Sequence, residues 1–271
     1  MSSTLLYRST ALGDEILLHG GGRSLVTKRG DTVFRQAAPW SATTIALLKH
    51  LEEVGFAHSP RIVGSGRDPE GREMLTYLDG DFVHPKAWDD DALPLLGQML
   101  NALHAATSTF VPPENARWRP WFGREVGRPS VIGHCDTGPW NIVSRDRLPF
   151  AFIDWEEAGP VDPLVELAQA CWLNAQLVDD DVAEKQGLPS VEARARQMRL
   201  LLDGYGLSRA KRGGFVDTIR DFVVFSAANE AIEARVTEDS QEVAPLWGIA
   251  WRSRSAAWII KHQSTLEIAL R

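Results

Sequence analysis

The chain has 271 residues, 44% of them hydrophobic, which is enough to bury a sizeable core in one large domain or two lobes. It carries 29 basic and 36 acidic residues, a net charge of −7, and no long Lys or Arg run, so nucleic acid and anionic membranes are not expected partners. Two cysteines are too few for a disulfide framework, and the first residues lack a signal-peptide apolar core. We therefore expect a soluble, cytoplasmic protein.

Strand-forming residues dominate the first part of the chain. Short runs bounded by turn residues predict an antiparallel sheet of five strands at residues 15–19, 24–28, 32–35, 61–64 and 72–78. Between the third and fourth runs, Ser41 is the expected cap of a helix, and Gly55 should end it in the left-handed conformation that glycine favours. Gly20, Gly21 and Gly22 separate the first two runs. They form either a plain hairpin turn or a loop whose backbone N–H groups approach phosphates closely.

Helical periodicity dominates the later part of the chain. The acidic run at residues 89–91 precedes a helix that reaches residue 103, and we interpret it as a helix start favoured by the dipole. Further helices are predicted at residues 164–178, 190–205, 215–235 and from 243 onward. Strands followed by helices indicate an α+β fold. Trp247, Trp251 and Trp258 share one helical face, for which core packing or a dimer contact is favoured over ligand stacking.

Oxygen-bearing side chains gather among three further strand-forming runs, at residues 131–132, 142–143 and 150–153. Asp136, Asn141 and Asp154 fall at the ends of these runs. A hairpin joining the last two runs would bring Asp154 beside the loop that carries the other two residues. Hard oxygen ligands suit Mg²⁺, which keeps several waters and takes one or two carboxylates plus substrate phosphates. The expected ligand is a nucleotide polyphosphate.

The two residues before Asp136 have interpretations of their own. His134 is expected to be a structural histidine that braces the loop by hydrogen bonding. Cys135 next to an imidazole could be an activated thiol nucleophile. Adjacent residues in an extended chain point to opposite faces, so the two side chains are badly placed to share a proton. The thiol mechanism is therefore disfavoured.

Over this stretch the chain resembles the phosphotransferase family that includes the aminoglycoside phosphotransferases, a branch of the protein-kinase-like fold. The resemblance is carried by the pattern H-x-D-x-x-x-x-N at His134, Asp136 and Asn141, by Ile153-Asp154-Trp155-Glu156, and by Val161-Asp162-Pro163 leading to Glu166-Leu167-Ala168. It implies a bilobal molecule. A small nucleotide-binding lobe with an antiparallel sheet and one helix would span residues 1–78, and a larger, mainly helical lobe with the catalytic loop, metal site and acceptor pocket would span residues 79–271.

The resemblance also assigns roles to the site residues. Asp136 accepts or orients the substrate hydroxyl, and Asn141 and Asp154 are the Mg²⁺ ligands, in the order that protein kinases also show. Phosphoryl transfer through a loose transition state needs little early proton removal, so positioning should be the larger part of the role of Asp136.

On the nucleotide side, the resemblance places Arg35 where most kinases have a phosphate-pairing Lys. The triple glycine would cover the phosphates, and the backbone at Thr76 and Leu78 would bind the adenine edge. The first helix of a kinase supplies a Glu to the basic residue, whereas here its only acids, Glu52 and Glu53, lie in the last turn. Either Arg35 is held differently or activity is weakened.

The function implied is transfer of the γ-phosphate of ATP or GTP to a hydroxyl of a small polar molecule. An aminoglycoside-like acceptor is favoured, with amino alcohols and sugars as alternatives. Glu156, Glu157 and Glu230 could bind acceptor amines, although charged residues on helices usually form a solvated face. A nucleotide-binding regulator or pseudokinase without turnover is the other possible class. We expect a monomer or a homodimer.

Overall fold

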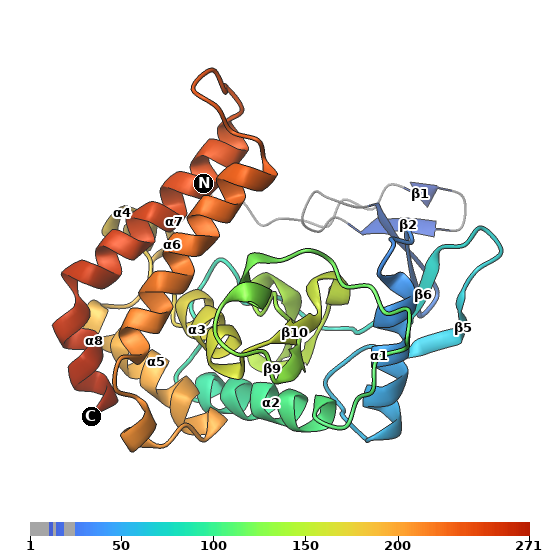
Figure 1. Ribbon diagram of the computed structural model, residues 1–271, viewed down its shortest axis with the longest axis horizontal. Helices are drawn as coiled ribbons and strands as arrows, with labels where there is room; N and C mark the ends of the chain where they lie inside the picture. The colour runs from blue at the N-terminus through green and yellow to red at the C-terminus, as the bar shows by residue number, and fades with distance from the viewer. Residues whose placement is uncertain (1–10, 13–14, 19–24) are drawn as a thin grey trace.

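The computed structural model describes residues 11–12, 15–18 and 25–271. The triple glycine at residues 20–22, and with it the predicted phosphate loop, lies outside the described residues. A sheet with one helix beside it forms one end of the molecule, and most of the helices pack at the other end, with short strands between them (Figure 1). The expected α+β fold is confirmed, and the division of the chain at residue 78 stays a prediction.

Among the described residues, the N-terminal sheet has six antiparallel strands in the order β1-β2-β3-β4-β6-β5. Its strands are β1 (Ala11–Leu12), β2 (Glu15–Leu18), β3 (Val26–Arg29), β4 (Thr32–Arg35), β5 (Ile62–Arg67) and β6 (Glu73–Thr76). The two-residue β1 was not predicted, and the other five strands match the predicted runs. The register of β4 and β6 places Arg35 directly opposite Glu73. Residues opposite each other on antiparallel strands are near neighbours, so the register gives Arg35 an acidic partner within the sheet.

Helix α1 (Ser41–Glu53) lies beside this sheet (Figure 1). The expected cap was wrong, because the helix begins at Ser41 and Trp40 occupies the capping position. The Ser41 hydroxyl instead accepts a hydrogen bond from the backbone N–H of Ala38 at 2.8 Å, so it ties down the turn before the helix. Gly55 follows the helix with a φ of +78°, as predicted.

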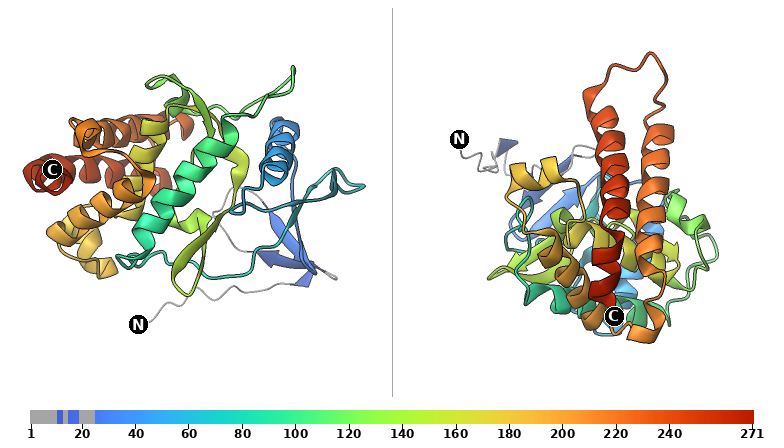
Figure 2. Two further views of the ribbon diagram at one scale, coloured as in Figure 1. Left: turned by 90° about the horizontal axis from the view of Figure 1, so that it is seen from below. Right: turned by 90° about the vertical axis from the view of Figure 1, so that its left-hand side faces the viewer.

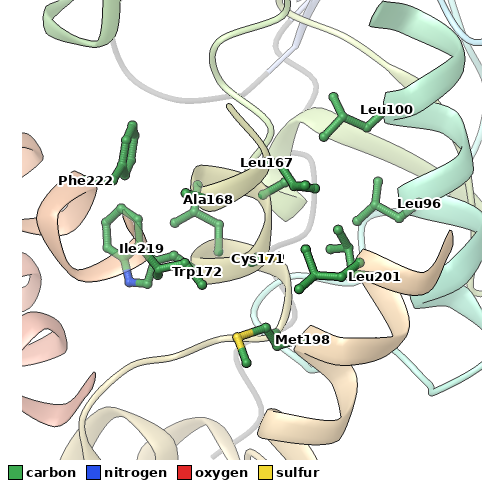
Figure 3. Close-up of a cluster of buried hydrophobic side chains, with 14 of the residues drawn as sticks. Leu96, Leu100, Leu167, Ala168, Cys171, Trp172, Met198, Leu201, Ile219 and Phe222 are labelled. Carbon is green, nitrogen blue, oxygen red and sulfur yellow. The ribbon is translucent and has the colours of Figure 1, made fainter. Parts of the chain in front are cut away.

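The other end of the molecule is built around one central helix, α3. The helices here are α2 (Ala92–Thr107), α3 (Pro163–Asn174), α4 (Asp180–Gln186), α5 (Val191–Tyr205), α6 (Phe215–Glu233), α7 (Val243–Lys261) and α8 (Gln263–Leu270). Apolar side chains of α3 pack between those of α2 and α5 on one side and α6 on the other (Figure 3). Helices α6 and α7 form an antiparallel pair that extends beyond the rest of the molecule (Figures 1 and 2). Within the described ranges, no helix has both the length and the apolarity to cross a membrane.

Two glycines bring α2 and α5 into backbone contact. A Cβ atom added at Gly97 of α2 would overlap the carbonyl oxygen of Leu201, and one added at Gly204 of α5 would overlap the carbonyl oxygen of Pro94. Helices can approach this closely only where side chains are absent. The contact fixes the position of α2 and therefore of His104, which reaches the site described below.

The acidic run before α2 serves ion pairs instead of a capping hydrogen bond. Asp91 occupies the capping position of α2, but its side chain makes no capping hydrogen bond in the described structure. Asp89 pairs with Arg147 at 2.6 Å and Asp90 pairs with Arg196 at 2.8 Å. Both pairs are exposed, so each contributes little stability.

Candidate active site

Two small antiparallel strand pairs position the predicted site residues. Strand β7 (Val131–Gly133) pairs with β10 (Gly159–Val161), and β8 (Ile142–Arg145) pairs with β9 (Leu148–Phe152). The loop after β7 carries Asp136, and a short 3-10 turn leads from it to Asn141 at the start of β8. The Asn141 side-chain N–H donates to Asp136 Oδ2 at 2.7 Å and to the backbone oxygen of Asp136 at 3.1 Å. Two of the three predicted oxygen donors are therefore in direct contact.

The hairpin of β8 and β9 returns the third residue to the same place. The backbone N–H of Ile153, directly after β9, donates to the backbone oxygen of Asn141 at 2.9 Å. Asp154 comes next and has a φ of +61°, a conformation that residues other than glycine rarely adopt. Such conformations persist where the surrounding structure holds them and are concentrated at functional sites. The predicted hairpin is confirmed, and it places Asp154 one residue from the backbone contact with Asn141.

His134 is fully buried and ties the two ends of the site together. The backbone N–H of Asp136 donates to its Nδ1 at 3.3 Å, so its Nε2–H donates to the backbone oxygen of Ile153 at 2.8 Å. Burial lowers the pKa of His134, which favours the neutral ring that this pattern requires. His134 therefore braces the loop, as the sequence predicted.

Cys135 is buried inside the loop and is not an activated nucleophile. Its φ of +64° turns the chain between His134 and Asp136, so the extended geometry assumed from the sequence does not apply here. Burial raises the pKa of the Cys135 thiol well above its ordinary value, and the nearby Glu166 carboxylate raises it further. The thiolate that nucleophilic attack needs is therefore disfavoured.

Two polar side chains on α3, Glu166 and Gln169, form hydrogen bonds with the loop that carries Asp136. Glu166 Oε1 accepts the backbone N–H of Cys135 at 2.6 Å, and its Oε2 lies 2.6 Å from His104 Nε2. Gln169 accepts the Thr137 backbone N–H at 3.1 Å and donates to the backbone oxygen of Cys135 at 3.0 Å. Burial raises the pKa of Glu166, but hydrogen bonds from His104 and Cys135 outweigh it and lower the pKa overall, so Glu166 stays ionised. Sequence reasoning missed these supporting roles, although polar residues three positions apart on an otherwise apolar helix were a usable signal.

Arg35 lies opposite this loop at the end of β4 and is only 9% exposed. Its guanidinium donates to Asp154 Oδ1 at 2.8 Å and to Glu156 Oε2 at 2.6 Å, and its Nε lies 3.5 Å from Glu73 Oε2. Burial opposes the charge, but the carboxylates outweigh it and raise the pKa of Arg35. In the described part of the chain these acids come from β6 and from the segment after β9. Arg35 is thus held differently from the basic residue of a kinase, one of the two outcomes that the sequence allowed.

Arg119 is a second, half-buried cation at the site, and no pattern in its local sequence singled it out. Its Nη1 donates to Glu156 Oε1, and its Nε lies 3.1 Å from Glu157 Oε1. Both oxygens of Glu156 are therefore occupied by guanidinium groups. Glu157 keeps one carboxylate oxygen, Oε2, that has no hydrogen-bond partner among the described residues.

Glu157 has unusual surroundings for a carboxylate. Its Oε2 is buried without a hydrogen-bond partner among the described residues. Burial raises the pKa of Glu157 to about 7, with Arg119 opposing the rise and Asp136, Glu156 and Glu233 adding to it. Glu157 therefore lies within electrostatic reach of Asp136 and is partly protonated near neutral pH.

The other predicted binding residues occupy less direct positions. The backbone N–H of Thr76 donates to the Arg61 oxygen at 2.9 Å, so this amide is used inside the sheet. Leu78 lies two residues beyond the end of β6, on the connection that leaves the sheet. Glu230 lies 3.2 Å from Arg252 in an ion pair between α6 and α7. None of these contacts tests the nucleotide or acceptor roles, which stay predictions.

The donor set fits a magnesium ion better than a metal that needs an all-protein cage. Within the described ranges, no group of three or more His, Cys, Asp or Glu side chains could hold a metal ion. Asn141 gives its amide N–H to Asp136, which leaves its Oδ1 as the acceptor end of the side chain. Together with the Asp154 carboxylate, this oxygen would supply two protein ligands if the metal were bound here. Mg²⁺ needs only one or two carboxylates when substrate phosphates and waters complete its shell.

Comparison with known proteins places this geometry in a family. Residues 116–196, which contain Arg119, the loop that carries Asp136, and α3, match the model of the phosphotransferase enzyme family. A protein of Rhizobium leguminosarum bv. trifolii named trifolitoxin immunity protein is 60% identical over 260 residues, which cover 96% of this chain and 100% of that protein. The chain belongs to the phosphotransferase enzyme family. The resemblance inferred from the catalytic motif is confirmed.

Solved structures of phosphotransferases share the fold. A choline/ethanolamine kinase family protein from Mesorhizobium loti has a TM-score of 0.61 and 17% identity, and the match covers 96% of this chain and 93% of that one. The GDP complex of an aminoglycoside 2'-phosphotransferase-IIIa has a TM-score of 0.54 and 16% identity, with 96% and 93% covered. At these identities the likeness establishes the protein-kinase-like fold and leaves the acceptor open.

Proposed function

We propose that this phosphotransferase-family chain transfers the γ-phosphoryl group of ATP or GTP to a hydroxyl group of a small molecule. The observation that carries the proposal is the 2.7 Å hydrogen bond between Asn141 and Asp136, in a loop whose hydrogen bonds also fix the backbone next to Asp154. A hydroxyl-positioning carboxylate, two oxygen ligands and the buried Arg35 are thereby supplied by neighbouring segments. These are the parts that phosphoryl transfer requires.

Each residue has a defined task in this scheme. Asp136, oriented by Asn141, accepts the hydrogen bond of the acceptor hydroxyl and aims its oxygen at phosphorus. Alignment supplies most of the effect, because the transition state is loose. Arg35 would exchange a carboxylate partner for phosphate oxygens, which its planar fork can bind in pairs. Asn141 Oδ1 and Asp154 would hold Mg²⁺, whose charge offsets that of the phosphates.

The nucleotide proposal has support from two sides. A structural neighbour is described as a GDP complex, which favours nucleotide use by this fold. In this chain the Thr76 amide is occupied inside the sheet, so Leu78 is the better candidate of the two for contact with a base edge. ATP and GTP are both retained as donors.

We further propose that the acceptor is a toxin that phosphorylation inactivates. The relative named trifolitoxin immunity protein is 60% identical to this chain, whereas the aminoglycoside phosphotransferase is 16% identical. Sequence similarity therefore favours an immunity role over modification of an aminoglycoside. In the competing proposal, a regulator without turnover, the protein would confer immunity by binding the toxin only.

Immunity in cells separates these two proposals. The wild-type chain, Asp136→Asn and Asp146→Asn are expressed in cells sensitive to trifolitoxin. Asp146 is a matched control, because it is an exposed carboxylate on the turn between β8 and β9. Phosphotransfer predicts that wild type and Asp146→Asn protect the cells and Asp136→Asn does not. Full protection by Asp136→Asn at equal protein level would favour binding without turnover.

A coupled ADP-release screen tests the chemistry itself. Purified protein is incubated with Mg²⁺ and ATP or GTP, together with trifolitoxin, aminoglycosides, amino alcohols or sugars. The proposal predicts acceptor-dependent ADP or GDP release with at least one member of the panel. Tight Mg²⁺-dependent nucleotide binding with no release across the panel would contradict it.

A further inference from the structure

A cavity of about 240 Å³ lies between the catalytic loop and the last helices. Its lining residues come from the 3-10 turn before β8, the end of α3, the segment that follows it, α4 and α7. Four of the described lining residues carry aromatic rings: Trp140, Trp247, Trp251 and His84, which lies between β6 and α2. Trp140 is four residues from Asp136 along the chain, so their Cα atoms lie at most ~14 Å apart. The loop that carries Asp136 therefore also forms part of the cavity wall, through Pro139 and Trp140.

Two of these tryptophans are exposed, and one of them, Trp247, belongs to the helical face for which the sequence favoured core packing or a dimer contact over ligand stacking. Trp140 is 38% exposed and Trp247 is 46% exposed. Trp258, on the same helix as Trp247, is only 3% exposed and belongs to the core as expected. Large rings at the edge of a cavity leave apolar area in water, and a stacked ligand would remove that area from water.

Gln176 provides an independent sign of a ligand in the same cavity. The residue is 6% exposed, and its Nε2 donates to the backbone oxygens of Pro85 at 3.3 Å and Lys86 at 3.4 Å. Its Oε1 is buried and has no hydrogen-bond partner among the described residues. A buried acceptor without a donor is costly, so a ligand that brings an N–H or O–H group to Gln176 would lower that cost.

The charges around the cavity argue against a cationic ligand. None of the described lining residues is Asp, Glu, Lys or Arg. Burial lowers the pKa of His84, so this ring is neutral near pH 7. The guanidinium of Arg254 lies over the Trp247 ring at 5.8 Å, and that of Arg252 lies over the Trp251 ring at 5.5 Å. A positively charged acceptor would find no carboxylate here, and two of the rings already have cations over them.

We propose that this cavity binds the body of the acceptor and selects a flat, uncharged aromatic or heteroaromatic group that donates one hydrogen bond to Gln176. The inference rests on the proposed function, which makes the bound ligand a phosphate acceptor. It argues against polycationic aminoglycosides as that acceptor. Size agrees with this class. An apolar cavity of about 150 Å³ accepts benzene, so about 240 Å³ has room for a fused bicyclic ring.

The cavity is tested first by binding alone, without nucleotide. The full chain is titrated with indole, with benzofuran, which has the same shape but no N–H group, and with tetramethylammonium. Indole should bind about fivefold more tightly than benzofuran, the usual effect of one hydrogen bond, and tetramethylammonium should bind more weakly than both. Trp247→Ala should weaken indole binding about fivefold. Its matched control is Leu246→Ala, the neighbouring position on α7, which does not line the cavity and should bind indole like wild type.

Several results would overturn the cavity proposal. They are the absence of indole binding, equal affinity for indole and benzofuran, equal affinity of Trp247→Ala and Leu246→Ala, or a preference for tetramethylammonium. Gln176→Met gives a second line of evidence, because it should abolish the preference for indole over benzofuran. Should Gln176→Met fail to fold, since its amide also holds residues 85 and 86, the Trp247 comparison still decides.

Turnover separates the cavity proposal from the proposed function. Indole has no hydroxyl group, so its binding reports on the cavity alone, even if no alcohol ever gives ADP release. With an acceptor that does turn over, Trp247→Ala should raise KM and leave kcat nearly unchanged, the pattern of lost uniform binding. Turnover with the same KM in Trp247→Ala and Leu246→Ala would keep the phosphotransferase and overturn the cavity as its acceptor site.

Discussion

Replacing Glu157 by Gln should remove a large part of the pH dependence of stability. Burial raises the pKa of Glu157 from an ordinary 4.5 to about 7. Between these values the folded protein binds more protons than the unfolded chain, so the free energy of unfolding falls as pH rises. The stabilising contribution is complete below about pH 4.5 and is lost by about pH 7. At ~1.36 kcal/mol per pKa unit the total is about 3 kcal/mol, of which about 2.5 kcal/mol falls between pH 5 and pH 8.

The assay is denaturant unfolding of wild type, Glu157→Gln and Glu114→Gln at pH 5 and pH 8. Glu114 is an exposed glutamate and serves as the control for the chemical change. From pH 5 to pH 8, the free energy of unfolding of wild type and of Glu114→Gln should each fall by about 2.5 kcal/mol more than that of Glu157→Gln. Contributions from other titrating groups cancel in this comparison. An equal loss in all three proteins would refute the reasoning, because Glu157 would then be ionised throughout.

Two further substitutions test the ion-pair cluster and the helix contact. Arg35→Met leaves the acids around it, including Asp154 and Glu73, without their cation, so the free energy of unfolding should fall by about 3 kcal/mol and Mg²⁺-nucleotide affinity should be lost. Arg35→Lys should recover part of the stability, measured by unfolding, and part of the affinity, measured by nucleotide titration. An Arg35→Met protein as stable as wild type would contradict a stabilising role for this ion-pair cluster. Gly97→Ala should cost about 1–3 kcal/mol in denaturant unfolding, because its Cβ would overlap the backbone of α5. Gly213→Ala, where an added Cβ meets no atom within 4 Å, should cost little, and equal stability of the two alanine variants would argue against close packing.

The oxygen donors of the site could be found from the sequence because their geometry is local. Asp136, Asn141 and Asp154 lie within one loop and one hairpin, and the alternation of apolar runs with turn residues is enough to place them at strand ends. The same holds for Gly55, where a single backbone conformation decides the outcome. Short-range patterns therefore predicted the centre of the site and the fold class.

The residues that support the site could not be placed in the same way. Arg119 and Glu73 contact it only because distant segments meet in three dimensions, and their local sequence surroundings resemble those of ordinary surface residues. Ser41 shows the same limit on a smaller scale. Its hydroxyl was expected to cap the first turn of the helix, but it accepts a hydrogen bond from the backbone N–H of Ala38 in the preceding turn.

The measurement that most directly tests a phosphotransferase centred on Asp136 is the turnover of Asp136→Asn with an acceptor that the wild type phosphorylates. Turnover should fall by about 10²–10⁴-fold, the usual contribution of a positioned acid–base group, while Mg²⁺-nucleotide affinity stays close to that of wild type. Asp146→Asn should transfer phosphate at the wild-type rate. Turnover by Asp136→Asn at the wild-type rate would contradict the account.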